Sequence, residues 1–145
     1  YVEIANKYNV DRSKIDLEIT ESAIIDRNVD TIKILNNIKE KGFTISIDDF
    51  GTGYSSLSML QSTPIDVIKI DKVFVDKADL DSEKNIINYI MYLAERLEVR
   101  TIVEGVETKE QVEFIRKLNC DVIQGYYYSK PLNKEDFEEY MEKNR

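Results

Sequence analysis

The chain has 145 residues, of which 42% are hydrophobic, and a formal net charge of -8 with no histidine. This length suits one domain with its own core, and the composition is that of a globular protein. The negative charge argues against a nucleic-acid polymer as partner, and the lack of histidine excludes histidine metal sites and histidine acid–base catalysis. No apolar run approaches the roughly 18 residues of a membrane span, and the first residues do not resemble a signal peptide. We therefore expect a cytoplasmic domain with no direct membrane contact, which leaves open a membrane anchor in upstream segments of the parent protein.

Short apolar runs alternate along the chain with segments of helical periodicity. Strands are predicted at 15–19, 43–47, 67–70, 101–103 and 122–123, and helices at 29–41, 54–62, 82–98, 109–119 and 134–143. Typical end signals accompany the helices: Asp30, Ser82 and Asn133 as caps, Thr108 with Gln111 as a capping box, and Gly42 as a left-handed residue after a helix. About five strand–helix alternations predict an α/β fold with a parallel sheet, either doubly wound or closed as a barrel.

Three of the predicted strands alternate between polar and apolar residues. The polar positions are Asp16 and Glu18 in the first, Thr44, Ser46 and Asp48 in the second, and Lys69 and Asp71 in the third. A parallel strand covered by helices on both faces is normally apolar throughout, so one polar face indicates a barrel wall that lines a polar pocket. Five strands do not close an eight-stranded barrel, which takes about 250 residues. The sequence therefore predicts a (β/α)8 TIM-barrel type of fold, here an incomplete barrel of about five β/α units.

Charged and polar residues stand at or just beyond the end of each predicted strand. They are Glu18 and Glu21, Asp48 and Asp49, Lys69 and Asp71, Glu104 and Glu107, and Gln124. The carboxyl ends of parallel strands lie on one rim, where barrel active sites are found. Carboxylates gathered there repel one another unless cations lie among them. Oxygen ligands without cysteine or histidine favour Mg²⁺ or Mn²⁺, and the adjacent Asp48 and Asp49 could reach two ions, as in two-metal phosphoryl chemistry.

Each of these motifs also has an ordinary structural interpretation. An Asp-Asp pair is more often a helix cap or a solvated loop, Lys69 could simply pair with Asp71, and Glu104 could be an exposed turn residue. Their occurrence at five successive strand ends favours a functional site. Carboxylates and a lysine with Mg²⁺ also suit proton abstraction in an enolase-type lyase, although two adjacent aspartates favour two ions over one.

Five segments, LEITES, DDFGTGYSSL, IKIDKVFV, VEGVET and QGYYYSKPL, carry a family resemblance. In order and spacing they resemble the signatures of EAL domains, the bacterial phosphodiesterases that hydrolyse cyclic di-GMP, over Ile15–Leu132. The sequence departs from the family at Val103, where alanine is common, and in QGYYYSKPL, which has tyrosines where leucine and phenylalanine are common. Neither departure affects a charged position. The resemblance implies a (β/α)8 barrel with two Mg²⁺ or Mn²⁺ ions, and hydrolysis of cyclic di-GMP to linear pGpG in second-messenger signalling.

The resemblance also implies a role for each rim residue. The implied metal ligands are Glu18, Asp48, Asp49 and Glu104, with Asp48 bridging the two ions. The implied catalytic residues are Lys69, which would position and help to activate the attacking water, Asp71 beside it, and Gln124. Glu21 and Glu107 would support the site from behind, Glu21 by anchoring the DDFGTG loop.

The family's Glu-Ala-Leu motif and an asparagine ligand from an earlier strand do not occur in this sequence. We therefore expect residues 1–145 to be the C-terminal portion of a single EAL-type phosphodiesterase domain, inactive as this fragment alone. Exposed barrel-edge strands favour association, so a homodimer is expected, with sensory or GGDEF-type domains upstream. The alternative is a non-catalytic EAL-like module that binds cyclic di-GMP or a partner protein.

Overall fold

The computed structural model describes residues 1–25, 29–51, 57–76 and 81–144. One parallel sheet is formed by β1 (Asp16–Thr20), β2 (Thr44–Phe50), β3 (Val67–Ile70), β4 (Arg100–Val103) and β5 (Val122–Ile123), in that order. The strands have the same order in space as in the sequence, so each new strand is added on the same side of the preceding one, as in a barrel wall. A doubly wound sheet reverses its order part-way. The predicted parallel α/β sheet is confirmed, and its order favours the barrel type.

The described residues also form α1 (Val2–Lys7), the 3-10 helix η1 (Arg12–Lys14), α2 (Glu21–Ile25), α3 (Val29–Glu40), α4 (Leu57–Ser62), α5 (Lys72–Asp76), α6 (Asp81–Leu97), α7 (Lys109–Lys117) and α8 (Lys134–Lys143). The five predicted helices are present, although residues 54–56 of the second lie outside the described residues. The sequence did not predict α1, η1, α2 or α5, because segments this short show little periodicity, whereas α4 was predicted within the longer segment 54–62. No helix in the described part of the chain is long and apolar enough to cross a membrane.

Most of the predicted helix ends are confirmed. Thr108 and Gln111 form the capping box of α7, and Asn133 accepts a hydrogen bond from the backbone of Asp136 at the start of α8. Gly42 has a φ of 88°, as expected of a left-handed residue after a helix. The caps predicted before α3 and α6 are wrong: Asp30 and Ser82 lie inside those helices as their second residues.

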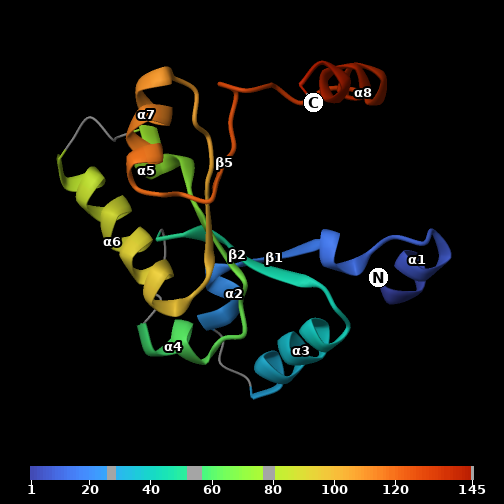
Figure 1. Ribbon diagram of the computed structural model, residues 1–145. Helices are drawn as coiled ribbons and strands as arrows, with labels where there is room; N and C mark the ends of the chain where they lie inside the picture. The colour runs from blue at the N-terminus through green and yellow to red at the C-terminus, as the bar shows by residue number, and fades with distance from the viewer. Residues whose placement is uncertain (26–28, 52–56, 77–80, 145) are drawn as a thin grey trace.

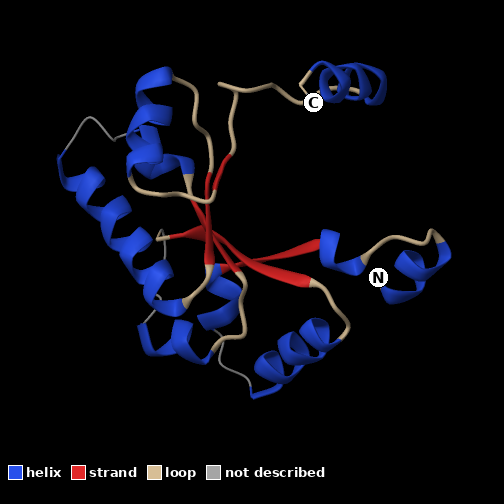
Figure 2. Ribbon diagram, viewed as in Figure 1, coloured by secondary structure: helices blue, strands red, loops and turns tan. Residues whose placement is uncertain are grey.

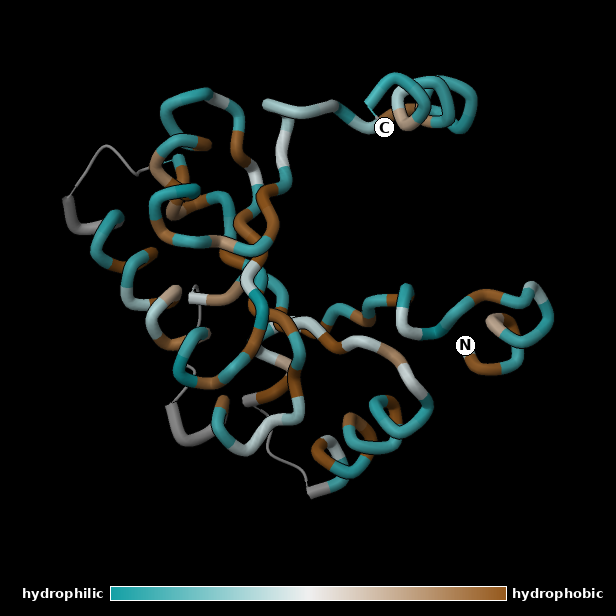
Figure 3. The backbone as a smooth tube through the Cα atoms, viewed as in Figure 1, coloured by the Kyte–Doolittle hydropathy of each residue, from teal (hydrophilic) through white to brown (hydrophobic). Residues whose placement is uncertain are grey.

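The core lies between one face of the sheet and the helices that cover it. Ile45, Ile47, Ile68, Ile70 and Val103 are fully buried and belong to one cluster with side chains of α3 to α7. Figure 1 and Figure 2 show α2, α4, α5, α6 and α7 gathered on one side of the strands, with α8 apart from them. In Figure 3 brown, hydrophobic segments follow the strands, whereas α8 is mainly teal and has no buried residue.

The other face of the sheet carries the polar positions of β1, β2 and β3, together with apolar residues such as Val67 and Ile102. On β2, Ser46 alternates with the buried isoleucines, and the register places it opposite Glu18 of β1, with Asp48 opposite Thr20. A hollow of about 220 Å³ on this face is lined by residues that include Asp16, Val67 and Ile102. The alternation predicted from the sequence therefore separates a helix-covered apolar face from a polar, partly open one.

The turn after β2 is built around a glycine. Asp49 and Gly51 have φ values of 55° and 96°, and the pairing with β3 shifts register between Ile47 and Phe50. A Cβ on Gly51 would lie 2.9 Å from ring atoms of Phe74 in α5. The backbone N–H of Gly51 donates to Glu21 Oε2 at 3.0 Å, and Glu21 is itself buried. These contacts fix the turn between α2 and α5.

We predict that Gly51→Ala destabilises the domain by about 3 kcal/mol, because a left-handed backbone and a clash with Phe74 act together. Gly42→Ala is the matched control: its φ is 88°, but the nearest atom to the new Cβ would be 3.9 Å away. The free energy of unfolding of that variant should fall by only about 1 kcal/mol, because of backbone strain. Urea unfolding measures both, and equal losses would contradict the packing contribution of Phe74.

Candidate active site

A buried lysine lies among three carboxylates at the carboxyl ends of the strands. The side chain of Lys69 is 6% exposed, and its Nζ lies 2.6 Å from Glu18 Oε1, 3.1 Å from Asp48 Oδ1 and 2.8 Å from Glu104 Oε1. Glu18 and Asp48 belong to β1 and β2, and Glu104 directly follows β4. The structure therefore brings together four of the residues that the sequence singled out. We call these residues the Lys69 cluster.

Neighbouring charges and burial shift the pKa of Lys69 in opposite directions. Burial by itself lowers the pKa of its ammonium, but the close carboxylates of Glu104, Glu18 and Asp48 outweigh burial and raise the pKa above its ordinary value. Lys69 is consequently a cation and a hydrogen-bond donor at neutral pH. It cannot act as a general base in this arrangement.

Two polar atoms of β2 are buried without a hydrogen bond among the residues that the structure describes. They are Ser46 Oγ and Asp48 Oδ1. Asp48 Oδ1 lies within ion-pair distance of Lys69, but no hydrogen bond of acceptable geometry reaches it. Buried polar atoms in native proteins nearly always have partners, so such atoms indicate a place for water or an ion.

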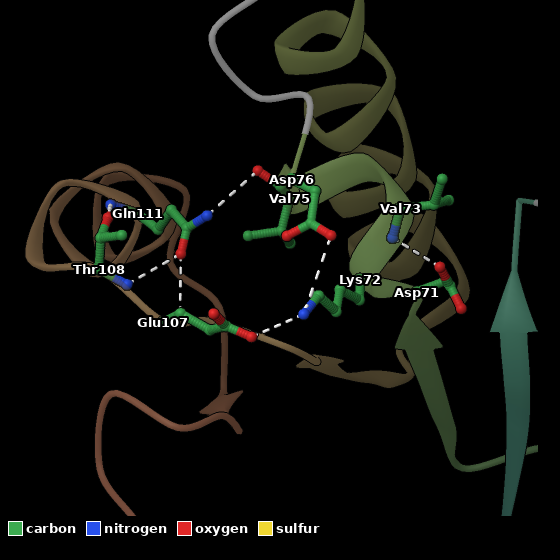
Figure 4. Close-up of polar contacts among 8 residues, drawn as sticks. All are labelled: Asp71, Lys72, Val73, Val75, Asp76, Glu107, Thr108 and Gln111. Atoms are coloured by element: carbon green, nitrogen blue, oxygen red, sulfur yellow. Dashed lines mark hydrogen bonds and ion pairs between the residues drawn. The ribbon is translucent and has the colours of Figure 1, made fainter.

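Asp49 and Asp71 form a second acidic pair beside the cluster. The contact with the Asp71 carboxyl, together with burial and the charges of Asp48 and Glu104, raises the pKa of Asp49. Figure 4 shows Asp71 at the start of α5, where its Oδ1 accepts a hydrogen bond from the backbone N–H of Val73 at 2.6 Å. Asp71 therefore caps α5 in addition to facing Asp49.

Gln124 and Glu107 lie further from the cluster. Both line a cavity of about 500 Å³ that Glu104 also lines. The backbone N–H of Gln124 donates to Val103 O at 2.8 Å, which holds β5 beside β4. Glu107 pairs with Lys72 at 2.6 Å (Figure 4). Within the described residues, neither side chain joins the ion pairs of Lys69.

The donor atoms of the site fit a hard divalent cation. The candidate ligands Glu18, Asp48, Asp49 and Glu104 offer carboxylate oxygens, which Mg²⁺ and Mn²⁺ prefer, and Asp48 Oδ1 lacks a hydrogen bond. The described residues contain no group of three acidic side chains already placed to hold one ion. Instead, Lys69 Nζ lies between three of these carboxylates. The assignment of the four ligands remains a prediction.

One residue with a clear place in the site was missed from the sequence. Lys72, the first residue of α5, lines the cavity beside Glu104 and pairs with Glu107. It is the second lysine of the segment IKIDKVFV, three residues after Lys69. Its position one residue beyond the strand-end aspartate could have placed it on the rim.

Comparison with known proteins identifies the family. The family model described as EAL domain matches residues 1–131. The chain belongs to the EAL domain family. It is 39% identical over 128 residues to the cyclic di-GMP phosphodiesterase NbdA of Pseudomonas aeruginosa, and 40% identical over 142 residues to the probable cyclic di-GMP phosphodiesterase PdeB of Escherichia coli. These matches cover 88% and 98% of this chain, but the chain spans only 16% and 27% of the length of those relatives.

Solved EAL structures have the same fold. The EAL domain of Mycobacterium smegmatis DcpA superposes with a TM-score of 0.91 at 32% identity, over 99% of this chain and 65% of that one. The complex of Klebsiella pneumoniae BlrP1 with manganese and cyclic di-GMP superposes with a TM-score of 0.83 at 27% identity, over 90% of this chain and 33% of that one. The predicted TIM-barrel type is thereby confirmed. Proteins of this fold include one that binds a divalent metal together with cyclic di-GMP.

We predict that Asp49→Asn stabilises the metal-free domain at neutral pH. Because the pKa of Asp49 is raised, its contribution to stability is fully present below the ordinary value of 3.8 and is lost as the pH rises through the raised value. Asparagine removes the charge and tolerates the left-handed φ of 55°. The melting temperature should rise on the order of 2 °C at neutral pH and much less near pH 3.8.

Glu113→Gln on α7 is the control for this effect, since Glu113 is exposed and, within the described residues, its ion pair is with Lys109 one helical turn away. That variant should leave the melting temperature unchanged at both pH values. A lower melting temperature of Asp49→Asn at neutral pH would contradict repulsion among the rim carboxylates.

Proposed function

We propose that the natural chain carrying this domain hydrolyses cyclic di-GMP to linear pGpG with two Mg²⁺ or Mn²⁺ ions. The observation that carries the proposal is the convergence of Glu18, Asp48 and Glu104 on Lys69 at the ends of three parallel strands. Membership of the EAL family supports it, as do the names of two relatives as cyclic di-GMP phosphodiesterases. The family match gives no support to the enolase-type alternative.

The proposed ligands are Glu18 for one ion, Asp48 for both, and Asp49 and Glu104 for the other. When bound, the ions supply Lewis-acid activation of water and of the phosphodiester. The four carboxylates would hold this charge from residues in or next to strands, which favours a fixed geometry over one supplied by loops alone. BlrP1, which shares the fold, has been solved with manganese and cyclic di-GMP, and this supports a divalent cofactor.

Lys69 acts as a cationic donor in the proposed reaction. Its raised pKa keeps the proton on Nζ, so it can donate a hydrogen bond to the attacking water or to a phosphoryl oxygen that gains negative charge. Gln124 presents an amide at the cavity of about 500 Å³ beside Glu104, a volume within the range of small-molecule sites. Asp71 lies next to Asp49 on the same rim and completes the proposed catalytic set.

Glu21 and Glu107 support the site through backbone and side-chain contacts in this proposal. Glu21 accepts the hydrogen bond of Gly51 and so holds the turn that follows the two aspartates. Residues 52–56 of the DDFGTGYSSL segment lie outside the described residues. Glu107 acts on the turn that begins at Glu104, through its ion pair with Lys72.

The remaining expectations concern the parent protein. We propose that residues 1–145 are the C-terminal portion of a single EAL-type phosphodiesterase domain, and that they are inactive when expressed alone. We also propose a cytoplasmic homodimer with sensory or GGDEF-type domains upstream. Because the chain spans less than a third of the curated relatives, activity has to be measured on the full natural chain.

A specific observation favours the alternative, a non-catalytic EAL-like module. Lys69 already neutralises part of the acidic cluster, and the described residues contain no preformed group of three metal ligands. A module that binds cyclic di-GMP or a partner protein without cleaving it would need no metal at this place. The turnover experiment separates the two functions.

We predict that the full natural chain converts cyclic di-GMP to pGpG in the presence of Mg²⁺ or Mn²⁺, and that Asp48→Asn lowers kcat by about 100-fold or more. Glu113→Gln serves as the surface control and should retain activity within about twofold. Product analysis by chromatography gives the rates. Binding of cyclic di-GMP without any pGpG in the unaltered protein would refute the hydrolase and support the binding module.

A further inference from the structure

We propose that Lys72 is a positioning residue that fixes the turn Glu104–Glu107 and thereby aims the Glu104 carboxylate at Lys69 Nζ. The inference rests on the proposed function for the role of Glu104. The structural part of the inference depends only on the contacts of the turn. Lys72 does not belong to the Lys69 cluster, and it has no role among those implied by the family motifs.

The aliphatic stem of Lys72 fills the space beside Gly105. Gly105 has a φ of 66°, in the left-handed region. A Cβ at Gly105 would lie 2.4 Å from Lys72 Cγ, 2.5 Å from its Cβ and 2.7 Å from its Cδ. Both the backbone conformation and the contact therefore require glycine, and the turn lies directly against the lysine stem.

The end of β5 closes the turn from its other side. A Cβ at Gly125 would lie 2.1 Å from the carbonyl oxygen of Val106, so the two backbones also touch there. The backbone N–H of Val106 donates to Gln124 O at 3.1 Å, and that of Glu104 donates to Ile70 O at 3.0 Å. The turn is thus confined between the start of α5 and the end of β5.

The charged end of Lys72 ties the same turn to α5. Its Nζ lies 2.6 Å from Glu107 Oε1 and 3.9 Å from Asp76, as Figure 4 shows. In the same figure, Gln111 Oε1 accepts the backbone N–H of Glu107 at 2.8 Å, while its Nε2 donates to Val75 O at 3.4 Å. Two side-chain contacts, Lys72 with Glu107 and Gln111 with Val75, therefore link α5 to the start of α7 and the turn before it.

The aliphatic stem of Lys72, rather than its charge, should contribute most to holding the turn Glu104–Glu107 in place. The side chains of Lys72 and Glu107 are 48% and 44% exposed, and ion pairs this open to water contribute little to stability. By contrast, the contact of the stem with Gly105 is close and leaves no spare volume. Loss of the stem would let the turn relax, and Glu104, the residue before Gly105, would move away from Lys69 Nζ.

Three replacements of Lys72 in the full natural chain separate the two contributions. Lys72→Arg keeps stem and charge, Lys72→Met keeps the stem alone, and Lys72→Ala keeps neither. We expect Lys72→Ala to weaken Mn²⁺ binding about 10-fold by calorimetry, whereas methionine and arginine should stay within about threefold. Lys109→Met is the matched control, since within the described residues Lys109 forms its ion pair with Glu113 and does not line the cavity.

Amide hydrogen exchange gives a readout that needs neither metal nor turnover. Exchange in a peptide covering residues 103–108 should be roughly 10-fold faster in Lys72→Ala, and unchanged in Lys72→Met and Lys109→Met. Gly105→Ala forces the turn away from an intact Lys72 and should reproduce the alanine phenotype. It also serves as the second variant if Lys72→Ala fails to fold, which a melting curve reveals.

The outcomes distinguish this inference from the proposed function. Lys72→Ala with native exchange and native Mn²⁺ affinity would overturn the inference while hydrolysis by the unaltered protein still upholds the function. Equal damage from methionine and alanine would also overturn it, because the stem would then not be the cause. Faster exchange in Lys72→Ala in a protein that never cleaves cyclic di-GMP would uphold the positioning role and reject the function.

Discussion

The ammonium of Lys69 is surrounded by carboxylates from the ends of three strands, and the candidate site depends on this contact. A buried cation without partners is strongly unfavourable, and three carboxylates at this distance repel one another without a cation. The buried ammonium therefore requires the carboxylates, and the close carboxylates require the ammonium. The sheet makes the contact possible, because parallel strands in sequential order bring Glu18, Asp48 and Glu104 to the same rim. The raised pKa of Lys69 follows from this geometry and limits the lysine to donating hydrogen bonds.

One ammonium neutralises only one of the three carboxylates, so the Lys69 cluster keeps an excess of negative charge. The pKa of Asp49 is raised first by its contact with Asp71 and by burial, and the charges of Asp48 and Glu104 add to this shift. Two buried oxygens of β2, Ser46 Oγ and Asp48 Oδ1, have no hydrogen bond in the described residues. The excess negative charge of the cluster and the two β2 oxygens without a hydrogen bond both suit a divalent cation.

Much of the fold was predictable because its signals are local. The apolar runs place every described strand to within a few residues, and Ser46 and Lys69 mark the polar face by alternation alone. The strand-end rule also placed Glu18, Asp48 and Glu104 on one rim. It could not tell that Glu107 turns to Lys72 instead of Lys69, since that choice depends on how α5 packs against the next turn. Asp71 likewise gains a capping contact from a helix too short to predict.

Glycines at strand ends explain why the rim can be so closely packed. Gly51, Gly105 and Gly125 follow β2, β4 and β5, and at each a Cβ would collide with a neighbouring loop or helix. The position of each loop is therefore set by its neighbour more than by its own sequence. The departures from the family pattern lie elsewhere: Val103 is buried on the helix-covered face, and Tyr127 and Tyr128 are exposed. Neither Val103 nor these tyrosines enter the ion pairs of Lys69. A change in the turns is thus expected to disturb the carboxylates more than these departures do.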